Sequence, residues 1–330
     1  MREFRINSND SGQRLDKFVS KTVWGLPLSL MYKFIRKKRI KVNGRKAAER
    51  QILAEGDLVE MYIPDEFFEK DTRRDDTDEL SRVTPRLDVI YEDENIILLN
   101  KAPGILAHRG DEGDRRMADS SERETLLYHL KAYLYQKGEW DPADENSFSP
   151  ALCNRIDRNT GGIVIAAKRA EALREMNRLI KEGGVEKKYL AVLHGKMKRE
   201  RETLRAHLFK NSKTNTVRVT AEPTPGSKEI VTEYSVLSYN TELDLTLAEI
   251  TLHTGRTHQI RAHMASIGHP LLGDGKYAEN TADRAMGYKY QALASYKVSF
   301  KVSDGPLSYF DGKEFRLNDE KIPFLSLFKD

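Results

Sequence analysis

A short apolar run that follows two glycines constrains this chain more than any other stretch of its sequence. Residues 163–167 read Ile-Val-Ile-Ala-Ala, and a run of that length and composition predicts a buried strand. Gly161 and Gly162 precede the run, and a polar, charged segment from Asn154 to Thr160 precedes the glycines. The charged segment is therefore predicted to be a loop whose exit is fixed by a core strand, an arrangement in which rigid scaffolds often present reactive groups.

One carboxylate lies among cations within this loop. Asp157 directly precedes Arg158 and follows Arg155 by two residues. Taken alone, the segment fits a surface ion pair beside a glycine turn as well as it fits a reactive site. An arginine that pairs with a buried carboxylate keeps it ionised and oriented, and an oriented carboxylate can act as a nucleophile or a general base.

Chain length and cysteine content limit the class of protein. A chain of 330 residues is expected to form about two domains. Its single cysteine, Cys153, excludes an internal disulfide and a cysteine metal cluster, and fits a reducing, cytoplasmic location. No apolar run approaches the length of a membrane span, and residues 1–6 lack the apolar core of a signal peptide.

Charge is distributed unevenly along the chain. Residues 1–63 carry 14 Lys and Arg against 7 Asp and Glu, whereas residues 64–80 carry 3 against 8. We therefore expect a basic domain over residues 1–63, an exposed charged linker over residues 64–84 and a larger domain over residues 85–330. A compact basic unit favours a polyanionic partner, most often nucleic acid; ordinary fluctuation of charge along a sequence is the alternative.

The first 63 residues are expected to form a small mixed unit. A strand at residues 4–6 is followed by helices over 11–23 and 29–38, capped by Ser11 and Ser29. Asn43-Gly44 predicts a tight hairpin turn, and a further strand is expected at 58–63. The second helix ends in four consecutive cations, more than a helix dipole needs, which indicates a phosphate-contacting face formed by Arg36, Lys37, Lys38 and Arg39.

Residues 85–330 alternate between helical and strand patterns. Helical spacing of apolar residues predicts helices over 124–137, 169–182 and 258–267, with Thr257 as the N-cap of the last. Strands are predicted over residues 87–91, 96–99, 163–167, 185–194, 216–219, 229–238, 243–251 and 292–302. Because many strand pairs are joined by short turns, we expect an α+β fold with a mixed, mostly antiparallel sheet and flanking helices.

Several common chemistries lack their motifs. His253, His258 and His263 are spaced by five residues, which on a helix sets His258 and His263 on different faces, so no metal site is expected. The phosphate-binding loops of nucleotide enzymes and the GxSxG serine elbow are also missing from the sequence. A retaining glycosidase needs two carboxylates. A single aspartate, with cations from the helix of Arg256 and Arg261, fits a glycosidic-bond reaction whose leaving group is kept and reused.

Two resemblances extend this interpretation. Residues 10–63 resemble the small alpha-L (S4-like) RNA-binding domain through Arg14-Leu-Asp16, the basic second helix, Val42-Asn-Gly44 and Gly56-Asp-Leu-Val59. Residues 87–302 resemble the RluA family of pseudouridine synthases. The segments that carry this second resemblance are, in the family's order, Asn100-Lys-Ala-Pro-Gly104, Asn154-Arg-Ile-Asp-Arg-Asn-Thr-Gly-Gly162, Lys188-Tyr-Leu190, Thr254-Gly-Arg-Thr-His-Gln-Ile-Arg261 with His263, Gly268-His-Pro270 and Gly273-Asp274.

The RluA resemblance implies a pseudouridine synthase fold and an isomerase that converts uridine in RNA to pseudouridine without a cofactor or metal. Asp157 would be the catalytic aspartate, which attacks ribose C1′ or abstracts a sugar proton. Tyr189 would stack on the uracil, and Arg261 would pair with Asp157. Arg155 would hold the flipped-out nucleotide, since a base must leave its stack to react. Further RNA contacts are expected from Arg256, His258, Arg36, Lys37, Lys38 and Arg39.

The sequence departs from the family signature at three positions, where Asn154 replaces His, Ile156 replaces Leu and Gly161 replaces Ser. These changes bear on the choice of substrate more than on the reaction. The expected partner is RNA, as 23S ribosomal RNA or as ribosomal precursor particles. No membrane partner is expected, and the protein is expected to be a monomer. A non-catalytic RNA-binding ribosome-assembly factor with the same fold, and a nucleoside or glycoside hydrolase, are the alternatives.

Overall fold

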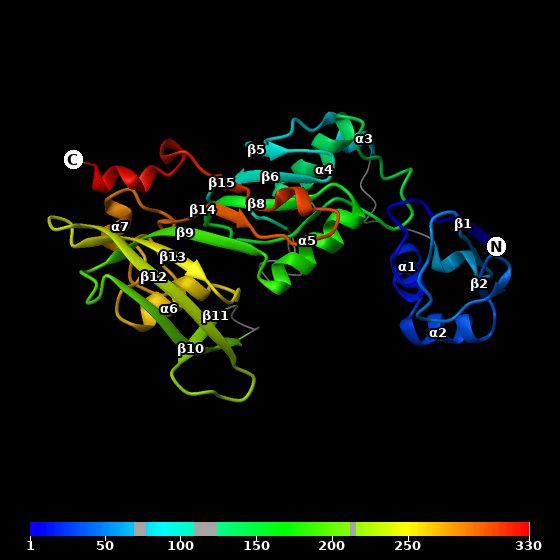
Figure 1. Ribbon diagram of the computed structural model, residues 1–330, viewed down its shortest axis with the longest axis horizontal. Coiled ribbons are helices and arrows are strands. Elements are labelled where there is room, and N and C mark those ends of the chain that lie inside the picture. The colour runs from blue at the N-terminus through cyan, green and yellow to red at the C-terminus, as the bar shows by residue number, and fades with distance from the viewer. Residues whose placement is uncertain (69–76, 109–123, 212–215, 330) are drawn as a thin grey trace.

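The computed structural model describes residues 1–68, 77–108, 124–211 and 216–329, which form two separate β-sheets (Figure 1). A four-stranded sheet with strand order β1-β4-β2-β3 lies in the N-terminal part. An 11-stranded sheet lies in the rest, with β11-β10-β12-β13-β9-β14-β8-β6-β5 as its main path and β7 and β15 attached to β8 and β14. Among the described residues, no helix is both long and apolar enough to cross a membrane.

The N-terminal part packs two short helices against its small sheet. Its elements are β1 (Arg2–Arg5), α1 (Leu15–Thr22), α2 (Leu28–Arg36), β2 (Ile40–Val42), β3 (Arg45–Lys46) and β4 (Leu58–Met61). The predicted hairpin turn is confirmed, because Asn43 and Gly44 join β2 to β3 with φ of 51° and 71°. The predicted caps are wrong. Arg14 and Pro27 precede the two helices, and neither helix has a side-chain cap.

The stretch expected to be an exposed linker contains ordered structure on both sides of residues 69–76, which lie outside the described residues. The short helix η1 (Asp65–Phe67) is followed by Phe68, which stacks with Phe4 at 6.3 Å. The helix α3 (Thr77–Arg82) buries Leu80 completely in the main core, and the Leu80 carbonyl accepts a hydrogen bond from Gln136 at 2.7 Å. Exposure is therefore the wrong expectation for this helix, because Leu80 anchors it.

The predicted mixed, mostly antiparallel sheet is confirmed. Its strands pair antiparallel except β8 with β14, which run parallel. The strands are β5 (Val89–Glu92), β6 (Ile96–Lys101), β7 (Ala151–Leu152), β8 (Gly161–Ala167), β9 (Val185–His194), β10 (Arg201–Asn211), β11 (Thr216–Thr220), β12 (Lys228–Asn240), β13 (Leu245–Leu252), β14 (Leu293–Phe300) and β15 (Glu314–Arg316). The sequence analysis did not predict β10, in which Arg201, Arg205 and Lys210 are exposed charged residues.

Helices and the C-terminal segment bury the two faces of this sheet. The helices are α4 (Leu126–Gln136), α5 (Ala170–Glu182), α6 (Gln259–Ser266) and α7 (Thr281–Ala285), followed by the short helices η4 (Ser308–Phe310), η5 (Asp319–Lys321) and η6 (Pro323–Phe328). Apolar residues of α4 and α6 belong to one core cluster, and those of α5 and the C-terminal segment belong to another. Strand β8 lies between them with every residue buried, as its apolar run predicts.

The N-terminal part contacts the larger part through polar side chains. The fully buried Asp10 accepts hydrogen bonds from Asn146 and Ser147, each at 2.6 Å. Asn9 accepts a bond from the backbone N–H of Ala170, the first residue of α5, at 3.0 Å. The apolar core of the N-terminal part is separate from the two clusters of the larger sheet. The two parts therefore adjoin through hydrogen bonds, while each has its own core.

Candidate active site

The loop between β7 and β8 is held in place by a glycine at the start of β8. Gly162 has φ of +114° and approaches β14 so closely that a Cβ there would lie 2.2 Å from the Ser295 carbonyl oxygen. Only glycine accepts both this backbone conformation and this approach. The loop also closes on itself, because the Thr160 N–H donates to the Asp157 carbonyl at 3.0 Å. The strand therefore fixes where the loop presents Asp157.

A buried lysine ties this loop to the turn that follows β6. The Lys101 ammonium is fully buried and donates to the carbonyl oxygens of Ala102, Ile105 and Arg158 at 3.1, 2.8 and 2.8 Å. The same Arg158 carbonyl accepts the Gly104 N–H at 2.9 Å. Three carbonyl acceptors compensate the cost of burying this ammonium. The residue that follows Asp157 is thus fixed through its backbone.

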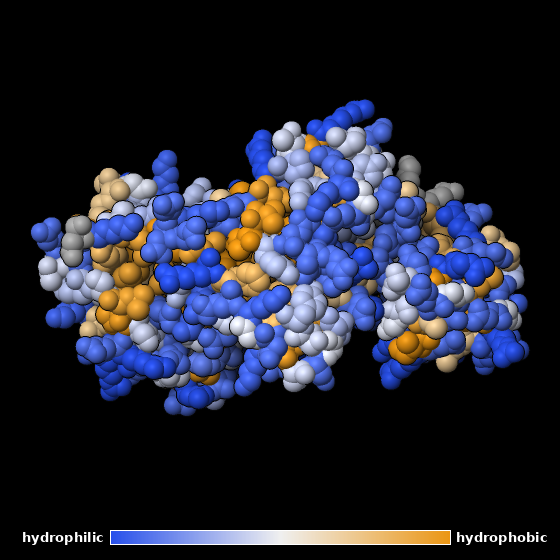
Figure 2. Space-filling view, turned by 45° about the horizontal axis from the view of Figure 1, so that its top comes forward, coloured by the Kyte–Doolittle hydropathy of each residue, from blue (hydrophilic) through white to orange (hydrophobic). Residues whose placement is uncertain are grey.

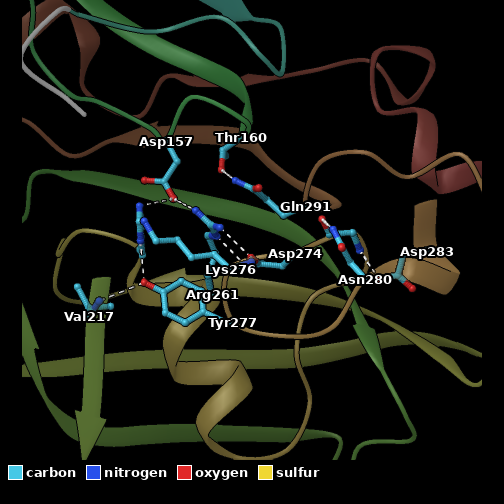
Figure 3. Close-up of polar contacts among 12 residues, drawn as sticks. Asp157, Thr160, Val217, Arg261, Asp274, Lys276, Tyr277, Asn280, Asp283 and Gln291 are labelled. Carbon is cyan, nitrogen blue, oxygen red and sulfur yellow. Dashed lines mark hydrogen bonds and ion pairs between the residues drawn. The ribbon is translucent and has the colours of Figure 1, made fainter. Parts of the chain in front are cut away.

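Asp157 faces residues at the start of the helix α6 and within it (Figure 3). Its Oδ2 accepts a hydrogen bond from Arg261 Nη1 at 3.1 Å and lies 3.9 Å from His258 Nε2. The Asp157 side chain is 24% exposed, so a substrate can reach it. The expected pairing of Asp157 with Arg261 is present, although the two residues are 104 positions apart in the chain.

Arg261 is bound more tightly by a second carboxylate. Its Nε and Nη2 donate to the two oxygens of Asp274, each at 2.7 Å, and its guanidinium lies over the Tyr277 ring at 5.3 Å. Burial alone would raise the pKa of Asp274, but the hydrogen bonds and charge of Arg261 hold that pKa below its usual value. The pair is almost completely buried, so water screens it little.

His258 joins the start of α6 to the neighbouring strand β11. It precedes α6 with φ of 52°, a left-handed conformation that is rare for histidine, so His258 and not the predicted Thr257 is the N-cap residue. Its Nδ1 lies 2.7 Å from the Tyr277 hydroxyl, which also accepts the Val217 N–H at 3.3 Å. Burial lowers the pKa of His258 to about 4. The imidazole is therefore neutral near pH 7.

Tyr189 lies in β9, paired with Ser295 of β14 in the sheet. Its side chain is 6% exposed and belongs to the same core cluster as Ile156, the residue before Asp157. Burial raises the pKa of the Tyr189 phenol to about 12, and the charge of Asp157 adds to this shift. The ring is thus close enough to sense the carboxylate, and the phenol stays protonated at neutral pH.

Comparison with known proteins places this chain in a family. A family model described as RNA pseudouridylate synthase matches residues 95–266. The chain is 30% identical over 322 residues to an RNA pseudouridine synthase homolog of Mycoplasma pneumoniae, which covers 96% of this chain and 94% of the relative. The chain belongs to the RNA pseudouridylate synthase family.

Other relatives agree with this assignment. The chain is 31% identical over 308 residues to ribosomal large subunit pseudouridine synthase C of Vibrio vulnificus, covering 92% of this chain and 90% of the relative. The solved structure of human RNA Pseudouridylate Synthase Domain Containing 4 has a similar fold, with a TM-score of 0.53 and 18% identity over 76% of this chain and 94% of that one. The protein is thus an isomerase of the pseudouridine synthase class, and the resemblance to the RluA family is confirmed.

The three departures from the family signature have structural partners in this synthase. Asn154 Oδ1 accepts the Ile165 N–H of β8 at 2.7 Å, so this side chain anchors the entry of the loop. Ile156 is buried in the core. A Cβ at Gly161 would lie 3.2 Å from the Pro103 ring, a contact that a larger residue would tighten. All three positions shape the loop around Asp157.

The residues expected to bind RNA lie in two places. Arg155 and Arg256 are exposed at the loop of Asp157 and just before α6, whereas His258 is part of the site itself. The four N-terminal cations are all exposed at the end of α2 and just beyond it, where Arg36 pairs with Glu49 at 3.1 Å. These four residues belong to the N-terminal part, apart from the larger sheet whose strand β8 follows the loop of Asp157 (Figure 1).

Sequence reasoning missed two residues of the synthase site. Asp274 and Tyr277 hold Arg261 and His258, whereas the sequence analysis gave Gly273-Asp274 only as a segment of the family resemblance and assigned no role to either residue. The motif match at Gly273-Asp274 was the one signal for the carboxylate. Tyr277 follows it by three residues, and no periodic pattern singles it out.

A cavity of about 560 Å³ lies elsewhere on the protein, at the end of α4. Two lysines and two glutamates of its lining neutralise one another. Lys168 pairs with Glu92 at 2.8 Å and also with Glu139, and Lys137 pairs with both of these glutamates. The cavity and the Asp157 site share no lining residue. The cavity is therefore separate from the candidate site around Asp157.

Proposed function

We propose that this protein isomerises specific uridines of large-subunit (23S) ribosomal RNA, with Asp157 as the catalytic carboxylate. The observation that carries the proposal is the accessible Asp157 carboxylate, fixed by a strand on one side and by Arg261 on the other. The choice of RNA is supported by relatives of 30–31% identity that are named ribosomal large subunit pseudouridine synthase C. The enzyme needs no cofactor in this proposal.

The chemistry follows from an ionised, oriented carboxylate. Asp157 either attacks ribose C1′ or removes a sugar proton, and the N-glycosidic bond to N1 breaks. The uracil then rotates within the site and rejoins C1′ through C5. The new C1′–C5 bond displaces Asp157 from C1′, or the sugar proton is returned, according to which first step occurs. The C5 proton is lost and N1 gains a proton, so the isomerisation neither gains nor loses atoms. The target nucleotide leaves its stack for this reaction. Arg155 helps to hold the nucleotide in this flipped-out conformation.

Arg261 and Tyr189 have separate roles in this proposal. Arg261 keeps Asp157 ionised and oriented through the 3.1 Å hydrogen bond. Tyr189 lies beneath the uracil and supports its ring while it is detached. Replacing Tyr189 with Phe keeps the ring, so any loss in that variant reports on the hydroxyl, such as a slower removal of the C5 proton.

The N-terminal part supplies RNA affinity in this proposal. We assign residues 1–63 to an S4-like RNA-binding domain, residues 64–84 to the connection and residues 85–330 to the catalytic domain. Support comes from the separate N-terminal core and from the exposed cations at the end of α2. Cations on a rigid element bind phosphates with little sequence preference. A cytoplasmic location and a monomeric state complete the proposal, and size-exclusion chromatography tests the latter.

A pseudouridine map of total RNA tests the function. RNA from cells with and without the gene is compared, and the deletion strain is complemented with the intact gene or with an Asp157→Ala copy. We expect at least one ribosomal site to disappear on deletion and to return with the intact gene only. Purified Asp157→Ala protein should still bind RNA, which controls for loss of folding.

Two outcomes would contradict this proposal. If the Asp157→Ala copy restored the modification, Asp157 would not be the catalytic group. If no ribosomal site depended on the gene, the target assignment would be wrong. A growth defect that the Asp157→Ala copy corrects would instead favour the non-catalytic assembly factor.

A further inference from the structure

We propose that Asp274 is a positioning residue, which holds Arg261 so that the guanidinium binds one oxygen of Asp157 and leaves the other oxygen for the substrate. This inference rests on the proposed function of Asp157. It starts from an asymmetry between two carboxylates that share one guanidinium.

The two carboxylates are bound differently. Asp274 receives two hydrogen bonds from Arg261 at 2.7 Å, whereas Asp157 receives one at 3.1 Å. Within the part of the chain that the structure describes, Asp157 Oδ1 has no hydrogen bond or ion pair, and Figure 3 shows that oxygen pointing away from Arg261. Guanidinium and carboxylate groups prefer the two-bond geometry. Asp274 therefore occupies the edge of Arg261 that would otherwise be free to bind both oxygens of Asp157.

The position of Asp274 is itself fixed. Its Oδ1 accepts the Lys276 N–H at 3.0 Å, and its backbone N–H donates to Leu271 at 3.1 Å. The preceding residue, Gly273, has φ of +79° and donates its N–H to the buried Asp283 at 2.7 Å. Tyr277 covers the guanidinium face. Arg261 therefore cannot rotate toward Asp157 without breaking several buried contacts.

The charges around Arg261 also support a positioning role for Asp274. Arg261 and Asp274 neutralise each other inside the protein, and His258 is neutral, so the remaining negative charge resides on Asp157. A carboxylate that keeps its charge and a free oxygen is a better nucleophile and base than one held in a two-bond ion pair. Removing the charge of Asp274 would leave the full positive charge of Arg261 facing Asp157.

Single-turnover kinetics of Asp274→Asn test the inference. The substrate is a transcript that contains the mapped uridine, and rates are measured with saturating enzyme from pH 3 to pH 8, a range that includes the titration of an aspartate. We expect the rate at neutral pH to fall about 10- to 100-fold and the acid limb of the profile to move by about one pH unit to lower pH. The dissociation constant for RNA should stay within about twofold, because Asp274 is buried.

Asp283→Asn is the matched control. Asp283 is a buried carboxylate of the same segment, 4% exposed, with contacts to the Gly273 N–H and to His194 at 3.1 Å and none to Arg261. We expect this variant to lower the thermal midpoint without moving the acid limb, because the amide oxygen of asparagine can still accept the Gly273 N–H that holds the turn. An equal shift of the limb in Asp283→Asn would overturn the inference, because loop damage alone would then explain it.

A second variant keeps the inference testable if Asp274→Asn does not fold. Asp274→Glu keeps the charge but displaces the guanidinium, so we expect a rate at least about tenfold lower with the acid limb in its original place. A wild-type rate in Asp274→Glu, or an unmoved acid limb in folded Asp274→Asn, would overturn the inference about Asp274. Neither result would contradict the proposed function of the protein. Absence of pseudouridine from the wild-type reaction would contradict the proposed function instead.

Discussion

Two buried histidines of this protein have lower pKa values in the folded state than in the unfolded chain. His263 of α6 is 2% exposed, and its Nδ1 lies 3.0 Å from the Thr232 hydroxyl. Burial lowers the pKa of His263 to about 4, and the same cause acts on His258. Both imidazoles are therefore neutral in the folded protein at pH values where they are partly charged in the unfolded chain.

This difference predicts a loss of stability in mild acid. As pH falls from about 6.5 to about 4, the unfolded chain binds protons at these histidines before the folded protein does, so the free energy of unfolding decreases. Each histidine contributes a slope of at most about 1.4 kcal/mol per pH unit. We expect the thermal midpoint of His263→Gln to fall less between pH 7.5 and pH 5 than that of the wild type.

His253→Gln is the control for this comparison, because His253 is 48% exposed and is paired with Glu233 at the surface. Its midpoint should follow the wild-type pH dependence. The same pH dependence in His263→Gln as in the wild type would show that His263 does not cause the loss.

At the scale of elements, the parallel contact between β8 and β14 decides where the loop of Asp157 lies. Gly162 and Ser295 are paired in register, and Gly162 leaves no space for a side chain. β14 also pairs with β9, which carries Tyr189. One strand thus sets the distance between the loop of Asp157 and the tyrosine.

We predict that Gly162→Ala destabilises the protein by about 3 kcal/mol or more, since an added Cβ would meet the Ser295 backbone at 2.2 Å. Gly138→Ala is the matched control, because Gly138 also has positive φ, +71°, but a Cβ there meets nothing within 4 Å. It should cost only about 1 kcal/mol. Equal thermal midpoints for the two variants would refute the packing argument.

At the scale of the whole molecule, one group of basic residues lies apart from the candidate site around Asp157. Lys37 and Lys38 are exposed in the N-terminal part, which has its own core. Figure 2 shows hydrophilic side chains over most of the visible surface of that part. Its contacts with the larger part are polar, through Asp10 with Asn146 and Ser147. Binding and catalysis are therefore expected to be separable by substitution.

We predict that the double variant Lys37→Gln, Lys38→Gln weakens RNA binding. The slope of log K for RNA binding against log salt concentration should become less steep by up to about two units, one for each phosphate that is no longer neutralised. Its single-turnover rate at saturating enzyme should match the wild type. Lys196→Gln with Lys198→Gln removes the same charge from exposed positions of the larger part. If both double variants weakened binding equally, the N-terminal cations would have no special role.

The sequence by itself determined most elements of the fold and the class of reaction. The buried strand at 163–167, the turn at Asn43-Gly44 and the full extent of β9 at 185–194 follow from local patterns. Such patterns depend on residues a few positions apart, so a single sequence contains them. The helix caps and the buried Leu80 escaped prediction, because backbone entry geometry and distant packing decide them.

Only the tertiary structure decided how the charges of the site are shared. Asp157, Arg261 and Asp274 come from a loop, a helix and a turn, and the sequence suggested the first pair without the carboxylate that binds Arg261 most tightly. The physical reason is that an ion pair forms between whichever groups the packed elements bring within about 3 Å. Local sequence determines which residues are charged and which strands are buried, whereas the choice of partner depends on how those strands and helices pack.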